Sequence, residues 1–149
     1  MRAVVQRVAS ARVTVEARVT GAIGTGLLVY LGIGADDDNA AVGYMVEKVA
    51  GLRIFADEAG KMNRSVVAAS GGVLVISQFT LYGDVRKGRR PAFDKAMEPK
   101  RAAELYDGFV SQMRAWVARV ETGEFRAHMI VEAAVDGPIT ILVDSSRLF

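Results

Sequence analysis

The sequence contains no cysteine, one histidine and three prolines among its 149 residues. Without cysteine, neither a disulfide framework nor a thiolate zinc site can form. No apolar run approaches the roughly 20 residues of a membrane-spanning helix, and Arg7 lies where a signal peptide would need its apolar region. The sequence therefore predicts a cytoplasmic protein with no membrane partner.

Familiar catalytic motifs are also missing. Any Ser-His-Asp triad would have to use His128, and no G-x-S-x-G, paired-carboxylate, H-E-x-x-H or P-loop motif occurs. The glycines of "GAIGTGLL" (21–28) lead into an apparent strand instead of the helix N-terminus that binds phosphate. If the chain is an enzyme, we expect it to work without a metal, a cofactor or a standard side-chain triad.

Charge is nearly balanced overall but unevenly distributed. The chain has 19 basic and 17 acidic residues, and its 51% hydrophobic content is that of a globular protein, which we expect to form one domain over 1–149. The densest cationic stretch holds Arg86, Lys87, Arg89 and Arg90. Such a patch on a nearly neutral protein favours a bounded anionic contact over the coating of long nucleic acid.

Hydrophobic periodicity predicts strands and two helices. The first helix is capped by Asp38 or Asn39, and the second begins near Pro99. Their apolar stripes are Val42, Met45, Val46 and Val49 in the first helix, and Leu105, Phe109, Met113, Trp116, Val117 and Val120 in the second, which Gly123 follows. The order of the elements indicates an α+β domain whose helices cover a sheet.

The predicted strands differ in character. They are a partly exposed antiparallel pair over 4–15, a buried strand over 26–35, a strand into a turn over 51–63, a central strand over 73–82 and two strands over 128–146. The last two strands should be joined near Gly137-Pro138, because proline cannot donate to a ladder.

The end of the predicted central strand is unusually polar. If the strand is extended throughout, Ser77 and Phe79 share one face, and Gln78 and Thr80 share the other. Either these polar side chains bond neighbouring backbone, or they floor a pocket in which main-chain N–H groups stabilise an oxyanion. Thr80 could be a nucleophile, but nothing adjacent in the sequence would activate it.

The basic stretch that follows also has two interpretations. It is either solvated surface or a grip on substrate phosphates next to the pocket. Phosphate contacts of this kind position a nucleic acid without reading its sequence.

Four segments together resemble the D-aminoacyl-tRNA deacylase family along essentially the whole chain. They are "MRAVVQRV", "GLRIFADEAGKMN", "SQFTLYGDVRKGRRPAF" and "DGPIT", of which SQFT and GP are the family's two signatures. The resemblance implies an α/β/β three-layer fold with two main helices on one face. It also implies a homodimer with its active site at the interface, and hydrolysis of the ester between a D-amino acid or glycine and the 3′ end of tRNA, including glycine mischarged on tRNA-Ala.

The resemblance assigns roles to particular residues. It makes Ser77, Gln78, Phe79 and Thr80 the pocket and its main-chain oxyanion donors, assisted by the substrate's 2′-hydroxyl. It implies that Gly137-Pro138 is cis, although most X-Pro bonds are trans, and that this pair enters the partner's pocket and rejects L-amino acids. Arg7 would pin that pair, Phe125 and Met129 would lie near the terminal adenine, and the acceptor phosphates would meet Arg86, Lys87, Arg89 and Arg90.

Two positions depart from the family pattern. Val135 replaces an asparagine two residues before the glycine, and His128 occupies a usually acidic position. We interpret His128 as a peripheral residue that contacts RNA and not as a catalytic base. Two alternatives to the deacylase stay open: a non-catalytic RNA-binding module, and a small-ester hydrolase with Thr80 as nucleophile.

Overall fold

A computed structural model describes residues 1–149 and contains a mixed β-sheet, a small hairpin and two α-helices. In chain order the elements are β1 (Arg2–Val15), β2 (Arg18–Ile23), β3 (Gly26–Gly32), α1 (Asn39–Gly51), β4 (Phe55–Ala56), β5 (Met62–Arg64), β6 (Gly72–Ser77), the 3₁₀ helix η1 (Phe79–Tyr82), α2 (Pro99–Met113), β7 (Val120–Thr122) and β8 (Ile130–Asp144). The α+β class is as predicted. Neither α-helix has the length and hydrophobicity needed to cross a bilayer.

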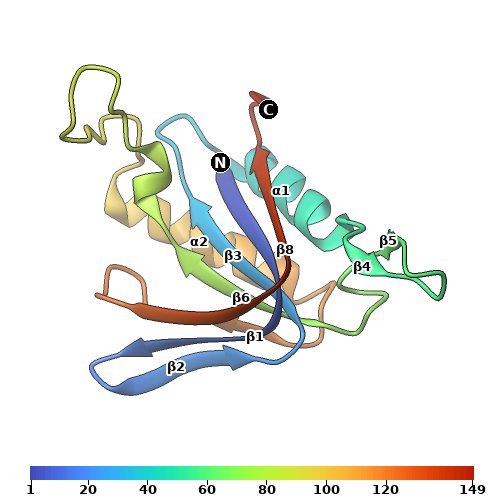
Figure 1. Cartoon of the computed structure of the whole chain (residues 1–149). Helices are drawn as coiled ribbons and strands as arrows, with labels where there is room; N and C mark the ends of the chain where they lie inside the picture. The colour runs from blue at the N-terminus through green and yellow to red at the C-terminus, as the bar shows by residue number, and fades with distance from the viewer.

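The main sheet is organised around β1. Its strand order is β2-β1-β3-β6-β7, and β8 pairs with β1 in addition. The partners of β1 are all antiparallel, whereas β3–β6 and β6–β7 are parallel pairs. Because β1 and β8 are long and bend together, the sheet curls toward a barrel (Figure 1).

Both faces of the curled sheet are packed. The larger core lies against the two helices, with Val29, Val46 and Phe109 among its buried side chains. A second cluster, which includes Val8, Leu28 and Ile76, fills the other face under the bent strands. Both helices lie on one side of the sheet (Figure 1).

Both helix starts are as predicted, but the end of α2 is not. Asp38 caps α1 by accepting a hydrogen bond from the Ala41 N–H at 2.9 Å, and Pro99 is the first residue of α2. However, α2 ends at Met113, Trp116 is 52% exposed, and Val120 belongs to β7, so Gly123 follows a strand. The apolar spacing continues through a turn that no glycine or proline announces, and the sequence pattern therefore overextended the helix.

Three strand predictions also need correction. Residues 4–15 belong to the single strand β1 and not to an antiparallel pair. The predicted strand 73–82 ends at Ser77, so the assignment of its polar residues to alternating faces is wrong beyond that point. The two halves of β8 do not form a hairpin, because both pair with β1 and only residues 136–139 bulge out, opposite Arg7.

Candidate functional site

A pocket of about 520 Å³ lies where β6 ends, between the start of α2 and the loop from β7 to β8. It brings together the predicted residues Ser77, Gln78, Phe79 and Met129. Sequence reasoning did not foresee the remaining lining residues, which are Ile76, Ala96, Met97, Pro99, Arg126, Ala127, His128 and Val131. The polar end of the central strand thus floors a pocket, which was one of its two interpretations.

The chain turns sharply at the floor of this pocket. The Gln78 N–H makes a last bond to the Leu31 carbonyl at 2.8 Å, and η1 then begins. Glycine is needed at position 32 in β3, because a Cβ there would lie 2.9 Å from the Gln78 carbonyl oxygen and 3.1 Å from the Leu81 Cβ. The small residue in β3 therefore allows η1 to sit directly against the sheet.

This turn leaves two neighbouring main-chain donors free. The first N–H groups of any helical turn lack partners within it, and here neither the Phe79 nor the Thr80 N–H has an acceptor in the chain. By contrast, the next amide, that of Leu81, donates to the Gln78 carbonyl at 3.3 Å. Adjacent unpaired amides beside a pocket can stabilise negative charge that develops on a substrate oxygen.

The polar side chains at the turn bond to each other. The Gln78 side-chain amide donates to the Thr80 hydroxyl oxygen. A nucleophilic threonine needs a neighbouring group that takes its proton, and the partner of Thr80 is a donor. The geometry therefore gives no support to Thr80 as a nucleophile.

Several aromatic side chains lie near η1. Phe79 is 57% exposed and stacks edge-on against Phe93, with ring centroids 5.0 Å apart. Phe125 packs on Tyr106 at 5.8 Å and lines a smaller adjoining cavity together with Ser77, Gln78 and Phe79. Burial raises the pKa of Tyr106, whose hydroxyl donates to the Val75 carbonyl at 2.8 Å. Tyr106 is thus a neutral structural group. Phe125 and Met129, the two residues predicted near the terminal adenine, both border the site.

The basic stretch lies on the connection between η1 and α2, which extends beyond the sheet (Figure 1). Arg86 is tied to Asp84, with its Nε 2.9 Å from Oδ1, and these bonds hold the pKa of Asp84 well below its usual range. Lys87, Arg89 and Arg90 are exposed and form no ion pair. Three of the four predicted phosphate-binding cations are consequently free, whereas Arg86 is already neutralised.

Gly137 and Pro138 lie in the bulge of β8, and the peptide bond between them is cis. The Arg7 Nε lies 2.9 Å from Asp136 Oδ2, off the N–H direction, so this contact is ionic. Arg7 also donates from Nη1 to the Ile54 carbonyl at 2.7 Å. Asp136 thus supports the bulge beside Val135. Within one chain, neither Gly137 nor Pro138 reaches the pocket at Ser77.

His128 and Arg126 are the ionisable residues of the pocket lining. His128 therefore borders the site instead of lying apart from it, although its side chain is exposed. The position of His128 in the sequence, between Phe125 and Met129, could have predicted that it borders the pocket. No three carboxylate or histidine side chains converge to form a metal-binding group.

Known protein families and solved structures show what this chain is similar to. A model of the family described as D-Tyr-tRNA(Tyr) deacylase matches residues 4–144. The chain belongs to the D-Tyr-tRNA(Tyr) deacylase family. Its similar relatives include two proteins named D-aminoacyl-tRNA deacylase. The one from Koribacter versatilis (strain Ellin345) is 61% identical over 100% of both chains, and the one from Symbiobacterium thermophilum is 59% identical over 100% of this chain and 99% of its own.

Two solved structures share the fold of this deacylase-family chain. One, described as "c-Myc DNA Unwinding Element Binding Protein", has a TM-score of 0.92 and 41% identity over 97% of this chain and 98% of its own. The other, described as a probable eukaryotic D-amino acid tRNA deacylase, has a TM-score of 0.82 and 20% identity over 95% of this chain and 97% of its own. At that lower identity the likeness concerns the fold alone.

Proposed function

We propose that this deacylase-family chain hydrolyses the ester bond of D-aminoacyl-tRNA and releases the free D-amino acid and tRNA. The observation that carries the proposal is a pair of unpaired amides, that of Phe79, which lines the pocket of about 520 Å³, and that of the next residue, Thr80. The D-aminoacyl-tRNA deacylases that are about 60% identical over the whole chain support the same reaction. Glycine mischarged on tRNA-Ala is a second proposed substrate, and the proposed place of action is the cytoplasm.

In the proposed reaction, water attacks the ester carbonyl while the two amides hold the developing oxyanion. The tetrahedral intermediate then collapses, the ester C–O bond breaks, and the 3′-oxygen leaves with a proton as the ribose hydroxyl. The chain offers no side-chain base paired to a nucleophile at this point, since the Thr80 hydroxyl contacts only a donor. We therefore propose that the substrate's own 2′-hydroxyl, next to the ester, assists the reaction in place of a protein side chain.

Rejection of L-amino acids is proposed to come from a second copy of the chain. The bulge with Gly137 and Pro138 is exposed and does not reach its own pocket, so it is available to enter another one. The surface around it suits a partner, because β8 leaves Ile130, Val135 and Leu142 exposed. The two packed faces of the sheet agree with the proposed three-layer arrangement of helices and two β layers.

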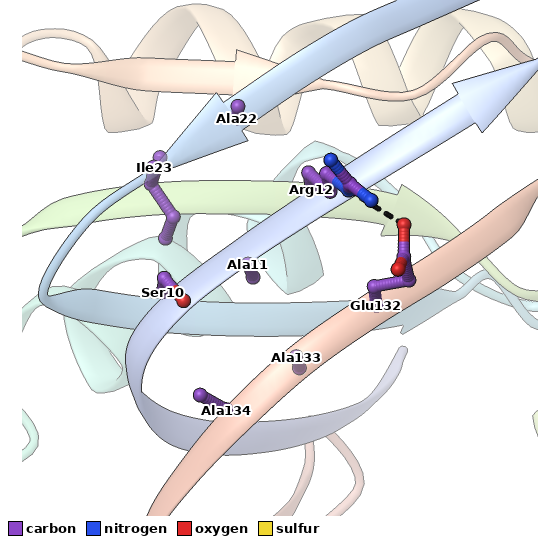
Figure 2. Close-up of a pocket in the computed structure, with 8 residues that line it drawn as sticks. All are labelled: Ser10, Ala11, Arg12, Ala22, Ile23, Glu132, Ala133 and Ala134. Atoms are coloured by element: carbon purple, nitrogen blue, oxygen red, sulfur yellow. Dashed lines mark hydrogen bonds and ion pairs between the residues drawn. The ribbon is translucent and has the colours of Figure 1, made fainter.

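The same surface continues into a shallow hollow of about 460 Å³ between β1, β2 and β8. Figure 2 shows four alanines in its lining, with the Arg12–Glu132 ion pair at one side. Small side chains leave the strand surface accessible to a neighbouring molecule. We propose that this surface lies in the homodimer interface.

The acceptor phosphates are proposed to bind the free cations of the basic stretch. We expect Arg89→Ala and Arg90→Ala each to weaken tRNA binding and to flatten its salt dependence, by about 0.7–0.9 in the slope of log K against log salt for each phosphate left without its cation. The measurement is tRNA binding across a salt series. Lys61→Ala is the matched control, because Lys61 is another exposed cation without an ion pair and lies on the distant β4–β5 hairpin (Figure 1). Equal slopes for all variants would contradict the assignment.

The direct test of the reaction is release of D-tyrosine from D-tyrosyl-tRNA by the purified chain. We expect release far above the rate in buffer. A non-catalytic RNA-binding module would bind the tRNA and leave the ester intact. A hydrolase that uses Thr80 as its nucleophile would lose its activity when the threonine hydroxyl is removed.

A further inference from the structure

We propose that Arg2 is a positioning residue that holds η1, and with it the free amides of Phe79 and Thr80, in the orientation that the reaction needs. This inference rests on the proposed function. It concerns the second residue of the segment "MRAVVQRV", which lies outside the pocket lining. Three separate contacts of one guanidinium carry it.

The first two contacts are made with η1 itself. Arg2 donates from Nη1 to the Leu81 carbonyl at 3.0 Å. Its Cζ also lies 4.6 Å from the centre of the Tyr82 ring. A planar guanidinium can make a directional hydrogen bond and stack on an aromatic face at the same time, whereas an ammonium group cannot reproduce both. Arg2 thus grips the C-terminal half of η1 in two directions.

The third contact fixes Arg2 to the sheet. Its Nε donates to Asp144 Oδ2 at 3.1 Å, and the Asp144 side chain is only 3% exposed. Asp144 is the only charged residue in the buried class, and it lies opposite Arg2 in the β1–β8 register. Its other carboxylate oxygen accepts a hydrogen bond from the Ser146 N–H at 2.6 Å. The guanidinium therefore has a rigid anchor.

The far side of Tyr82 is held as well. Its hydroxyl donates to Asp37 Oδ2 at 3.3 Å, and the same oxygen accepts the Gly34 N–H at 2.6 Å. A Cβ at position 34 would lie 2.6 Å from the Tyr82 hydroxyl oxygen, so glycine lets the ring approach the segment that follows β3. Tyr82 is consequently clamped between Arg2 and the segment after β3.

η1 depends on such external contacts because it is short. It has only four residues, and isolated 3₁₀ turns have poor internal hydrogen-bond geometry. Without Arg2, the carbonyl of Leu81 and the ring of Tyr82 lose the group that joins them to Asp144. The amides of Phe79 and Thr80 would then no longer point reliably at one place, and a displacement of about 1 Å can cost about 10² in rate.

The experiment compares kcat and KM for D-tyrosyl-tRNA among the wild-type chain, Arg2→Lys and Tyr82→Leu. Arg2→Lys keeps the charge facing Asp144 but loses the fork, and Tyr82→Leu removes the stacked ring while leaving the Arg2–Asp144 pair. We expect each to lower kcat by at least about tenfold while KM changes by less than about twofold. Arg18→Lys is the matched control and should keep wild-type kinetics, because Arg18 is an exposed arginine of β2 that pairs with Glu124.

A purely structural role for Arg2 predicts a different result. In that case the variants would melt at lower temperature, but kcat measured well below the melting transition would match the wild-type value, and this would overturn the inference. Wild-type kcat in both variants would overturn it too. A wild-type chain that leaves D-tyrosyl-tRNA at the buffer rate would instead refute the proposed function, so the two failures are distinguishable.

Discussion

Replacement of the Thr80 main-chain amide by an ester is expected to lower kcat for D-tyrosyl-tRNA by about 10²–10³, the usual cost of losing one oxyanion-hole donor. The substitution, made with the α-hydroxy acid analogue of threonine, replaces the N–H by an oxygen atom and keeps the side chain, although it also weakens the Phe79 carbonyl as an acceptor. Because that N–H has no acceptor in the chain, its loss breaks no hydrogen bond of the fold. Single-turnover hydrolysis measures the effect without interference from product release.

The matched variant is Thr80→Val, which keeps the amide and replaces the hydroxyl by a methyl group. We expect it to hydrolyse D-tyrosyl-tRNA at close to the wild-type rate, because the hydroxyl only accepts a hydrogen bond from Gln78. The opposite pattern, with an active ester and an inactive valine variant, would identify Thr80 as the nucleophile. That result would reject main-chain catalysis.

Gly137→Ala is expected to impair the discrimination between D- and L-aminoacyl-tRNA. Gly137 has a φ of +124°, which side-chain-bearing residues rarely adopt, and a Cβ there would lie 2.7 Å from Ile139 Cγ1. Holding alanine in this geometry costs about 1–3 kcal/mol, so the bulge should relax to another shape. If its carbonyl groups exclude L-amino acids, the ratio of kcat/KM values for D- and L-tyrosyl-tRNA should fall at least about tenfold, since about 1.4 kcal/mol corresponds to a factor of ten.

Gly24→Ala provides the control for this prediction. A Cβ at Gly24 meets no atom within 4 Å, and its φ lies outside the left-handed range. The D/L ratio of this variant should equal that of the wild-type chain. An unchanged ratio in Gly137→Ala would show that the bulge does not select the enantiomer.

Local signals in the sequence predicted much of the fold. Asp38 and Pro99 mark helix starts through chemistry that acts within one turn, and the apolar run 26–35 contains the buried strand β3. The strand end at Ser77 was not predictable from the alternation of residues, because the polar and apolar pattern continues unchanged into η1. The turn there depends on Gly32 in a neighbouring strand, which a local pattern does not reveal.

The candidate site was predictable only in part, for the same reason. Short motifs in a recognisable order predicted a pocket at the strand end and placed Phe125 and Met129 near the terminal adenine of the substrate. In the structure Met129 lines the pocket and Phe125 lines the adjoining cavity. The contacts of Arg2 were not predictable from local patterns, because its partners Leu81 and Asp144 are 79 and 142 positions away in the sequence. Likewise, the free state of the Phe79 and Thr80 amides depends on where a 3₁₀ turn begins, and residue types do not specify that point.

Hydrolysis of D- and L-tyrosyl-tRNA, prepared on the same tRNA and incubated with the purified chain, tests the central claim most directly. The claim is that a main-chain oxyanion site in this pocket cleaves the ester of one enantiomer. We predict rapid release of D-tyrosine and release of L-tyrosine at no more than the buffer rate. Equal rates for the two enantiomers, or no release of D-tyrosine above the buffer rate, would contradict it.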